Sequence, residues 1–176
     1  MTRSATEILR DEHRLILRVL LSLEAAAERV GGGGALPEGL WAGLIGWLRD
    51  FADRNHHAKE EEALFPAMIK AGVPARGGPI DVMLEEHAEG RALLRLMATG
   101  EPGERAGAAH RYVRLLRDHI DKENGILFPL ADAVLDERDQ AGVSREFGGT
   151  EVQLGEGACL ARAQDAAARF TAALEA

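Results

Sequence analysis

Residues 56–66 read HHAKEEEALFP, and a closely similar stretch, HIDKENGILFP, occupies residues 119–129. Each stretch contains a His-x-x-x-Glu pair followed after three residues by Leu-Phe-Pro. A histidine and a glutamate four residues apart lie on the same face of a helix, one turn above the other. Because such a pair can bind one metal ion, the repeat predicts a helical protein with two copies of a metal-binding turn.

A weaker repeat surrounds two further histidines. Aligning His13 with His87 also places Glu12 over Glu86. Both histidines lie on the apolar face of their helical pattern, so we expect them to point into the core. The chain is therefore predicted to use one two-helix unit twice, with an inward histidine on the first helix and a His-Glu pair on the second.

Turn-forming residues divide the chain into long helical segments. Glycines at residues 31–34 and a Gly- and Pro-rich stretch at residues 72–79 end helices, and Gly100 ends another. The expected helices cover residues 4–30, 37–71, 79–99 and 102–139. We expect Pro66 and Pro129 to kink the second and fourth helices just beyond the His-x-x-x-Glu turn.

The predicted fold class is all-α, an up-down-up-down four-helix bundle with an additional C-terminal helix. Residues 1–140 would form the metal-binding bundle, and residues 141–176 a tail packed on it. The tail is expected to be less regular after Gly142 and helical again over residues 158–174. The composition agrees, because 46% of residues are hydrophobic and 28% charged, as in a globular protein.

Charge and cysteine content exclude several functions. A formal net charge of −8 argues against binding a nucleic-acid backbone. The single cysteine, Cys159, excludes an internal disulfide and a cysteine-based zinc or iron–sulfur site, and we expect it to be an inert thiol. The N-terminus lacks the pattern of a secretory signal, and the apolar run at residues 15–23 is interrupted by Arg18. We therefore expect a cytoplasmic protein that does not associate with membranes.

Six residues are the candidate metal ligands. Buried carboxylates cost several kcal/mol unless they are paired or bind a metal, and no Lys or Arg lies on the same face as these two glutamates. A pair of cations would neutralise them, whereas a purely structural role would leave the charges uncompensated. The candidates are His13, His56, Glu60, His87, His119 and Glu123.

Several neighbouring residues have alternative interpretations. His57 and Glu61 form a second His-x-x-x-Glu frame, but the Leu-Phe-Pro alignment favours His56 and Glu60. Glu12 and Glu86 are expected to be exposed helix charges, with orientation of the ligands as the alternative. Tyr112 lies on the same face as His119 and would line the site or pack in the core. His110 is expected to face away, on the surface.

The ligand types limit the choice of metal. Four imidazoles and two carboxylates without thiolates suit iron, manganese or zinc. If both carboxylates bridge, each ion receives two nitrogens and two oxygens, which leaves positions open for a small ligand.

In the order of these residues, the chain resembles the hemerythrin family, in particular the bacterial HHE cation-binding domains, from about residue 6 to residue 136. The resemblance implies a four-helix bundle with a non-haem di-iron centre, bridged by two carboxylates and an oxo or hydroxo group. Family members bind dioxygen reversibly, sense oxygen or redox state, handle nitric oxide or peroxide, or take part in iron homeostasis and iron–sulfur repair.

One position departs from the oxygen carriers of this family. They have a further histidine four residues after the one that matches His87, and this chain has Arg91 there. The loss of that ligand makes a carrier role less favourable than reaction with peroxide or nitric oxide. We therefore expect two iron ions that bind or react with dioxygen, peroxide or nitric oxide. A redox-sensing or iron-homeostasis module without turnover is the alternative.

Overall fold

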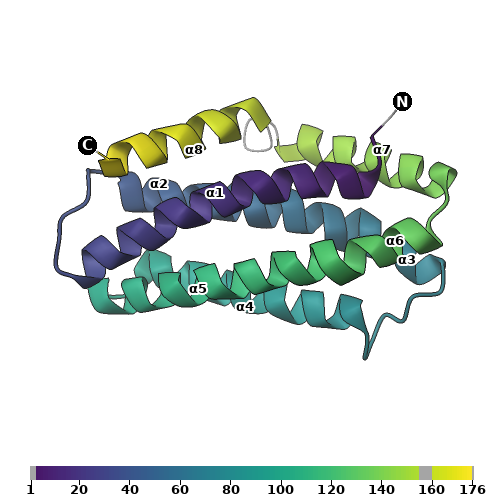
Figure 1. Cartoon of the computed structure of the whole chain (residues 1–176), viewed down its shortest axis with the longest axis horizontal. Coiled ribbons are helices and arrows are strands. Elements are labelled where there is room, and N and C mark those ends of the chain that lie inside the picture. Colours follow the sequence, from purple (N-terminus) through teal and green to yellow (C-terminus); the bar gives the residue numbers. More distant parts are fainter. Residues whose placement is uncertain (1–2, 155–159, 176) are drawn as a thin grey trace.

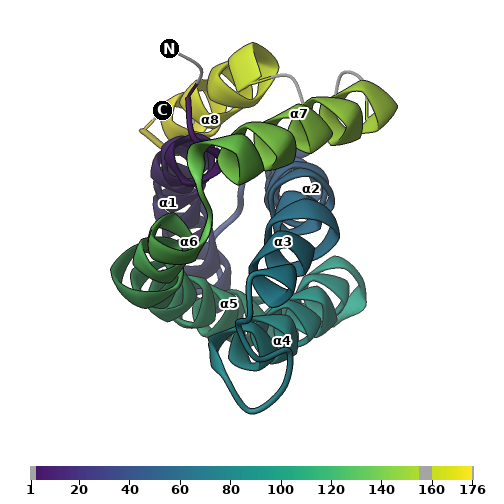
Figure 2. The same ribbon diagram turned by 90° about the vertical axis from the view of Figure 1, so that its right-hand side faces the viewer.

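The structure, a computed structural model, describes residues 3–154 and 160–175 and is helical without strands over these residues. The first bundle helix is α1 (Ala5–Gly31). The second is a continuous rod made of α2 (Leu40–Trp47), η1 (Leu48–His57), η2 (Glu60–Leu64) and α3 (Phe65–Lys70). The third is α4 (Pro79–Thr99), and the fourth comprises α5 (Pro102–Lys122), η3 (Glu123–Leu127) and α6 (Phe128–Val134). Viewed end-on, these four rods surround a common centre (Figure 2), which confirms the predicted bundle.

Local sequence explains the ends of the helices. Ser4 and Glu7 form a capping box at the start of α1, in which each side chain bonds to the other residue's backbone N–H. Pro79 occupies the first turn of α4, where its missing N–H costs nothing. The observed bounds of α1 and α4 agree with the predicted ones to within a residue.

Pro66 and Pro129 lie within continuous helical rods, and the kinks expected there stay a prediction. Both rods remain helical through Pro66 and Pro129, and the irregularity lies before each proline, in the π-helical turns η2 and η3. Phe65 donates its N–H to the Glu60 carbonyl, five residues back, and Phe128 does the same to Glu123. A proline ring clashes with the carbonyl four residues before it, and a wider turn relieves that clash.

The fourth helix ends earlier than predicted. Leu135 is extended (φ −100°, ψ 121°), and the helix does not reach residue 139. The side chain of Asp136 accepts the N–H of Asp139, which starts a new helix, α7 (Glu137–Leu154). An aspartate at this position is a strong helix-start signal.

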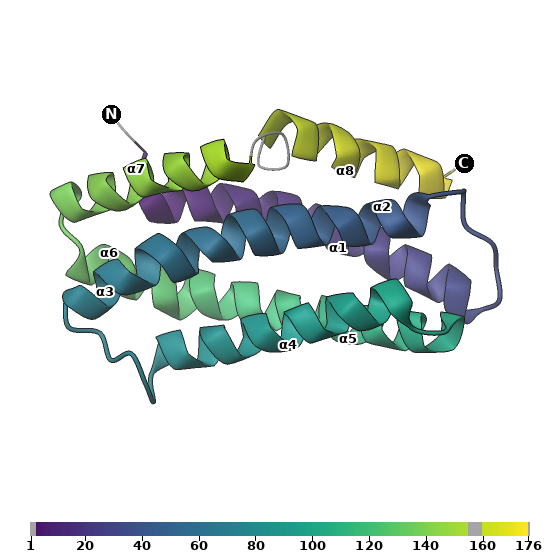
Figure 3. The same ribbon diagram turned by 180° about the vertical axis from the view of Figure 1, so that it is seen from behind.

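The tail is more helical than predicted. Helix α7 continues past Gly142, where we expected irregular chain, because Val143 and Phe147 lie one turn apart and are both buried. Helix α8 (Leu160–Glu175) follows, and its Ala163 carbonyl accepts a hydrogen bond from the Trp47 indole. The two helices lie end to end along one side of the bundle, over α1 and the second rod (Figures 1 and 3). Cys159 lies outside the described residues, and the division at residues 140 and 141 stays a prediction.

The bundle has two apolar clusters. One contains Leu20, Leu48 and Leu116, and the other contains Leu9, Leu64 and Phe128. The histidines and glutamates of interest lie between these clusters along the rods, as the core positions 13, 56 and 87 illustrate. The centre of the bundle is therefore polar but closed by apolar packing at both ends. Among the helices that the structure describes, none has an apolar stretch sufficient to cross a bilayer.

Candidate metal centre

The structure brings all six predicted residues together at the centre of the bundle. Each has a side chain at most 1% exposed. Together with His57, they form two groups, and within each group the ligand atoms all lie within 4.8 Å of one another. The first group is His13, His56, Glu60 and Glu123, and the second is His57, Glu60, His87 and His119. Glu60 belongs to both groups, as expected for a carboxylate that bridges two ions.

The four predicted histidines face one another in pairs. Nε2 of His56 lies 2.9 Å from Nε2 of His13, and Nε2 of His87 lies 3.1 Å from Nε2 of His119. The Nδ1 atom of each ring contacts an acceptor elsewhere, so the hydrogen-bond network assigns the proton to Nδ1 and a lone pair to Nε2. Two lone pairs at such a distance repel unless a proton or a metal ion lies next to them.

Glutamates support two of these rings from behind. Glu12 accepts from Nδ1 of His56 at 2.9 Å, and Glu86 accepts from Nδ1 of His119 at 2.8 Å. The expectation that both glutamates are exposed surface charges is wrong, since Glu12 is buried and Glu86 is half-buried. A carboxylate on the outer nitrogen fixes the tautomer and turns the inner nitrogen toward a metal. The contacts therefore favour the alternative interpretation, in which Glu12 and Glu86 orient the two histidine rings.

The other two rings have acceptors that the alignment did not identify. Glu61 accepts from Nδ1 of His87 at 2.7 Å, and the side-chain oxygen of Asn124 accepts from Nδ1 of His13 at 3.1 Å. Glu61 and Asn124 are the residues that follow the two candidate bridging glutamates. Glu61 of the second rod thus supports a histidine of α4, and Asn124 of the fourth rod supports a histidine of α1. These are contacts between helices, which a local spacing rule does not detect.

Phenylalanines of the Leu-Phe-Pro segments also hold the histidines. The Phe128 ring stacks on His13 with centroids 5.3 Å apart, and the Phe65 ring lies parallel to His87 at 6.1 Å. Each phenylalanine follows a candidate bridging glutamate by five residues, so the shared motif carries both a candidate ligand and an apolar ring that packs on a histidine. This explains in physical terms why Leu-Phe-Pro marks the register of the ligands.

The two central carboxylates have no ordinary partner. Among the described residues, no oxygen of Glu60 or Glu123 has a hydrogen bond, and their ion-pair contacts are with histidines only, such as His87 Nε2 to Glu60 at 3.4 Å. Burial and the charge of Glu123 raise the pKa of Glu60 well above its usual range. Burial also acts to raise the pKa of Glu123, but His119 and His13 together lower it. Ionising both of these buried carboxylates without a nearby cation has a high free-energy cost.

The histidines differ in how readily they accept a proton. Burial lowers the pKa of His56 to about 4, although its hydrogen bond to Glu12 opposes the shift. Burial likewise lowers the pKa of His87. For His119, burial is outweighed by Glu123 and Glu86, and the pKa is raised. The rings of His56 and His87 are therefore neutral at neutral pH, which is the form that binds metal.

A buried lysine, which the sequence patterns did not single out, completes one side of the centre. Lys59 is 0% exposed and forms ion pairs with Glu12 and with Glu151 of α7, the latter at 2.6 Å. Burial alone would raise the pKa of Glu12, yet the contacts with His56 and Lys59 lower it to about 2. Glu12 is thus a permanent carboxylate whose charge is balanced by Lys59.

Arg91 occupies the position of the missing carrier histidine and points away from the central atoms. It donates to Asp53 and to Glu61, both at 2.7 Å. Tyr112, in contrast, is core: its side chain is fully buried, and its hydroxyl has no partner among the described residues. Burial and the charge of Asp53 raise the pKa of Tyr112.

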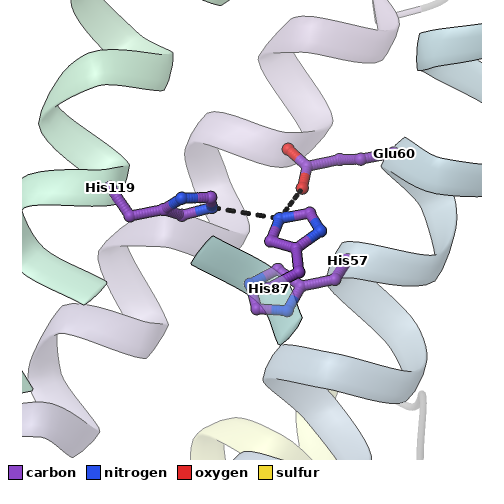
Figure 4. Close-up of side chains that lie close together, drawn as sticks. All are labelled: His57, Glu60, His87 and His119. Carbon is purple, nitrogen blue, oxygen red and sulfur yellow. Dashed lines mark hydrogen bonds and ion pairs between the residues drawn. The ribbon is translucent and has the colours of Figure 1, made fainter. Parts of the chain in front are cut away.

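His57 and Glu61, the alternative frame, are not excluded from the centre by the structure. His57 is buried against His87, and it is one of the four residues of the second group (Figure 4). Glu61 contacts the outer nitrogen of His87 instead of the central atoms. Of the two residues in this frame, the histidine therefore lies among the central ligand atoms, and the glutamate does not.

The residues present fit a pair of cations. The site offers inward imidazole nitrogens and carboxylate oxygens that no donor satisfies among the described residues. Buried polar atoms are nearly always paired, so these atoms indicate missing positive partners. Nitrogen and oxygen donors without thiolate are the ligands that divalent iron, manganese and zinc accept.

Comparisons with known proteins agree with this geometry. The chain is 43% identical to the iron-sulfur cluster repair protein DnrN of Neisseria gonorrhoeae, over 49% of this chain and 64% of the relative. It is 33% identical to the iron-sulfur cluster repair protein YtfE of Escherichia coli (strain K12 / DH10B), over 69% of this chain and 60% of the relative. The chain thus spans less than two thirds of the length of either relative.

No solved structure gave a significant match to the chain. Residues 4–131 match the family described as the hemerythrin HHE cation binding domain. This range contains all six predicted ligands and ends within α6, so it covers the bundle and leaves out α7 and α8. The chain therefore belongs to the hemerythrin HHE cation-binding domain family.

Proposed function

We propose that the chain binds two iron ions at this centre, and that the iron pair binds or reacts with dioxygen, peroxide or nitric oxide. The observation that supports it most directly is the set of unsatisfied atoms at the centre. Facing Nε2 atoms lie 2.9 and 3.1 Å apart, next to two buried carboxylates without hydrogen bonds among the described residues. Two cations would satisfy all of these atoms at once.

The two groups suggest how the ligands are shared. His13 and His56 would bind one ion, and His87 and His119 the other. Glu60 and Glu123 would bridge the two ions and balance their charge, because Glu60 belongs to both groups and Glu123 contacts histidines of both pairs. Iron is preferred over zinc and manganese because the relatives described above are named for iron–sulfur cluster repair.

Iron bound in this way supplies one-electron redox chemistry and open coordination positions for a small ligand. The chain's own residues prepare the centre for it. The backing carboxylates on His56, His87 and His119 hold the rings in one tautomer. The apolar clusters on both sides keep bulk water out, which strengthens every electrostatic interaction inside.

Anaerobic titration of the reduced protein tests the choice of ligand. Dioxygen, nitric oxide and peroxide are added separately, and the absorption spectrum and loss of each reagent are followed. Stoichiometric, reversible spectral change indicates a binder or sensor, whereas continuing loss of peroxide or nitric oxide that Glu60→Ala abolishes indicates an enzyme. If the iron-loaded protein leaves all three reagents and its own spectrum unchanged, the proposed reactivity is wrong.

A second candidate function is the repair of iron–sulfur clusters, in which the iron pair would be delivered to a damaged cluster. The names of the two relatives favour it. The test uses a purified [4Fe–4S] enzyme inactivated by nitric oxide, incubated with the iron-loaded chain, a thiol and sulfide. We expect recovery beyond that given by the same amount of free ferrous ion, and no recovery with His119→Gln. Recovery equal to the free-iron control would exclude repair by this chain alone.

A further inference from the structure

His57 is a buried histidine without a use in the proposed six-ligand set. Its side chain is 3% exposed, and neither ring nitrogen has a hydrogen-bond partner among the described residues. A buried polar group left without a partner costs about 1–3 kcal/mol. A plain apolar residue would fill the same space without this cost, so the imidazole requires an explanation.

The ring lies against the second half of the centre. Its centroid is 3.9 Å from that of His87, with an angle of 16° between the planes, and it meets the His119 ring edge-on at 5.5 Å. Figure 4 shows the His57 and His87 side chains reaching this point from different rods. One nitrogen of His57 lies within 4.8 Å of ligand atoms of Glu60, His87 and His119.

The π-helical stretch η1 explains how two consecutive histidines can both face inward. In an α-helix, neighbouring residues point about 100° apart, so one of the two would be turned away from the core. A π-helix has more residues per turn, which reduces that angle. His56 and His57 are the last two residues of η1, and both are buried. His56 serves the first group, and His57 lies in the second.

The outer nitrogen of His57 has the same kind of neighbour as those of the other histidines. Its Nδ1 lies 3.6 Å from an Asp53 oxygen, one helical turn earlier. Asp53 is held in place by Arg91, which donates to it at 2.7 Å. The arrangement repeats the carboxylate behind His56, His87 and His119, at a longer distance. It leaves Nε2 as the nitrogen with neither a hydrogen bond nor an ion pair among the described residues.

We propose that His57 is a fifth histidine ligand, which binds the ion held by His87 and His119 through Nε2. The two ions would then differ, one with two imidazoles and the other with three. This inference rests on the proposed pair of metal ions and adds an asymmetry to it. It also assigns a role to Arg91, which positions Asp53 behind the His57 ring.

Mössbauer spectroscopy of protein loaded with ⁵⁷Fe tests the asymmetry, and the iron content of each sample is measured first. With six ligands, both irons have two imidazoles and two carboxylates, and a single quadrupole doublet is expected. With His57 as a ligand, the wild type gives two doublets of equal area, and His57→Leu gives one. His110→Leu, at a half-buried histidine outside the centre, is the matched control and keeps both doublets.

A second variant guards against a local folding defect. His57→Ala opens a space for free imidazole, and added imidazole should restore the second doublet. A single doublet in the wild type, or two doublets that persist in His57→Leu, overturns the inference while the measured iron content of two leaves the proposed function standing. A wild-type chain that does not hold two irons overturns both.

Discussion

At the scale of single residues, the centre consists of imidazole rings and carboxylates whose orientation suits the binding of a cation. The rings of His56, His87 and His119 each donate from Nδ1 to a carboxylate, which leaves Nε2 facing the centre. The sequence predicted these histidines because ligands within one rod follow helical spacing. It did not predict the contact of Glu61 with His87, the role of Lys59 or the burial of Glu12, because these contacts join different rods, and nothing in local spacing encodes such contacts.

Metal binding should release protons. In the metal-free protein, burial and Glu123 raise the pKa of Glu60, while Glu123 and Glu86 raise that of His119 against its burial. Both groups keep their protons to a higher pH than usual and must lose them to bind metal, so metal affinity rises with pH. We therefore expect a net release of protons from each chain when metal binds at pH 7. Calorimetry of metal binding in buffers of different ionisation enthalpy measures the number released.

The control for proton release is Glu60→Gln, which should release about one proton fewer, since its side chain does not titrate. Proton release that is zero at pH 7, or that does not differ between Glu60→Gln and the wild type, would show that the central groups are already deprotonated before metal binds.

Loss of a backing carboxylate should weaken metal binding without removing a ligand. Glu12→Gln replaces the charged acceptor behind His56 and leaves Lys59 with Glu151 alone. We expect metal affinity to fall about 10- to 100-fold, the usual effect of such a change, measured by competition with a chelator. Glu85→Gln, at an exposed position of α4, is the matched control and should bind as the wild type does. Equal affinity of both variants would contradict a role for Glu12.

At the scale of elements, the π-helical turns and the tail differ most from the sequence-based prediction. Pro66 and Pro129 each follow a π-helical turn that begins with the candidate bridging glutamate, and the sequence analysis did not predict these turns. The break at Leu135 had a readable signal in Asp136, which caps α7. The sequence signal for the helicity of α7 was weaker. The glycines of α7 disfavour a helix, and only the burial of Val143 and Phe147 outweighs them.

Helix α7 should depend on one aromatic anchor. Phe147 is 1% exposed and packs in the cluster around Leu64 and Phe128, with Lys59 5.7 Å above its ring. Phe147→Ala leaves a cavity there, and we expect the free energy of unfolding to fall by about 3–5 kcal/mol. Chemical denaturation followed by circular dichroism measures the change.

Val152→Ala provides the matched control on the same helix, because Val152 is 82% exposed. Its free energy of unfolding should stay within about 0.5 kcal/mol of the wild type. If Phe147→Ala is equally mild, α7 does not dock on the bundle as described.

At the scale of the whole molecule, the sequence predicted the four rods and their order, because apolar periodicity and glycine breaks are local signals. How α7 and α8 cover α1 and the second rod was beyond its reach, since the docking depends on contacts between residues far apart, such as Trp47 with Ala163. The family match also stops at residue 131, before these helices begin. The sequence patterns and the family match thus describe the bundle, whereas the packing of the tail is seen only in the structure.

Metal removal should destabilise the whole bundle. Without cations, the centre buries two carboxylates and the His57 ring, whose polar atoms have no hydrogen-bond partner among the described residues. A ligand that binds only the folded state stabilises it by about 2.7 kcal/mol at a free concentration 100-fold above its Kd. We therefore expect the thermal midpoint of the loaded protein to fall by several degrees on exhaustive chelation and to recover on adding iron back. An unchanged midpoint would mean that the cations contribute nothing to folding.

We propose that four histidines and two glutamates of this chain bind two iron ions. The most direct test of this proposal is the metal content of the protein purified from iron-replete cells, measured together with the visible absorption spectrum. We predict two irons per chain with oxo-bridged di-iron absorption, and loss of both in the Glu60→Ala, Glu123→Ala double variant. Stoichiometric zinc alone, or no metal in carefully prepared protein, would contradict the account.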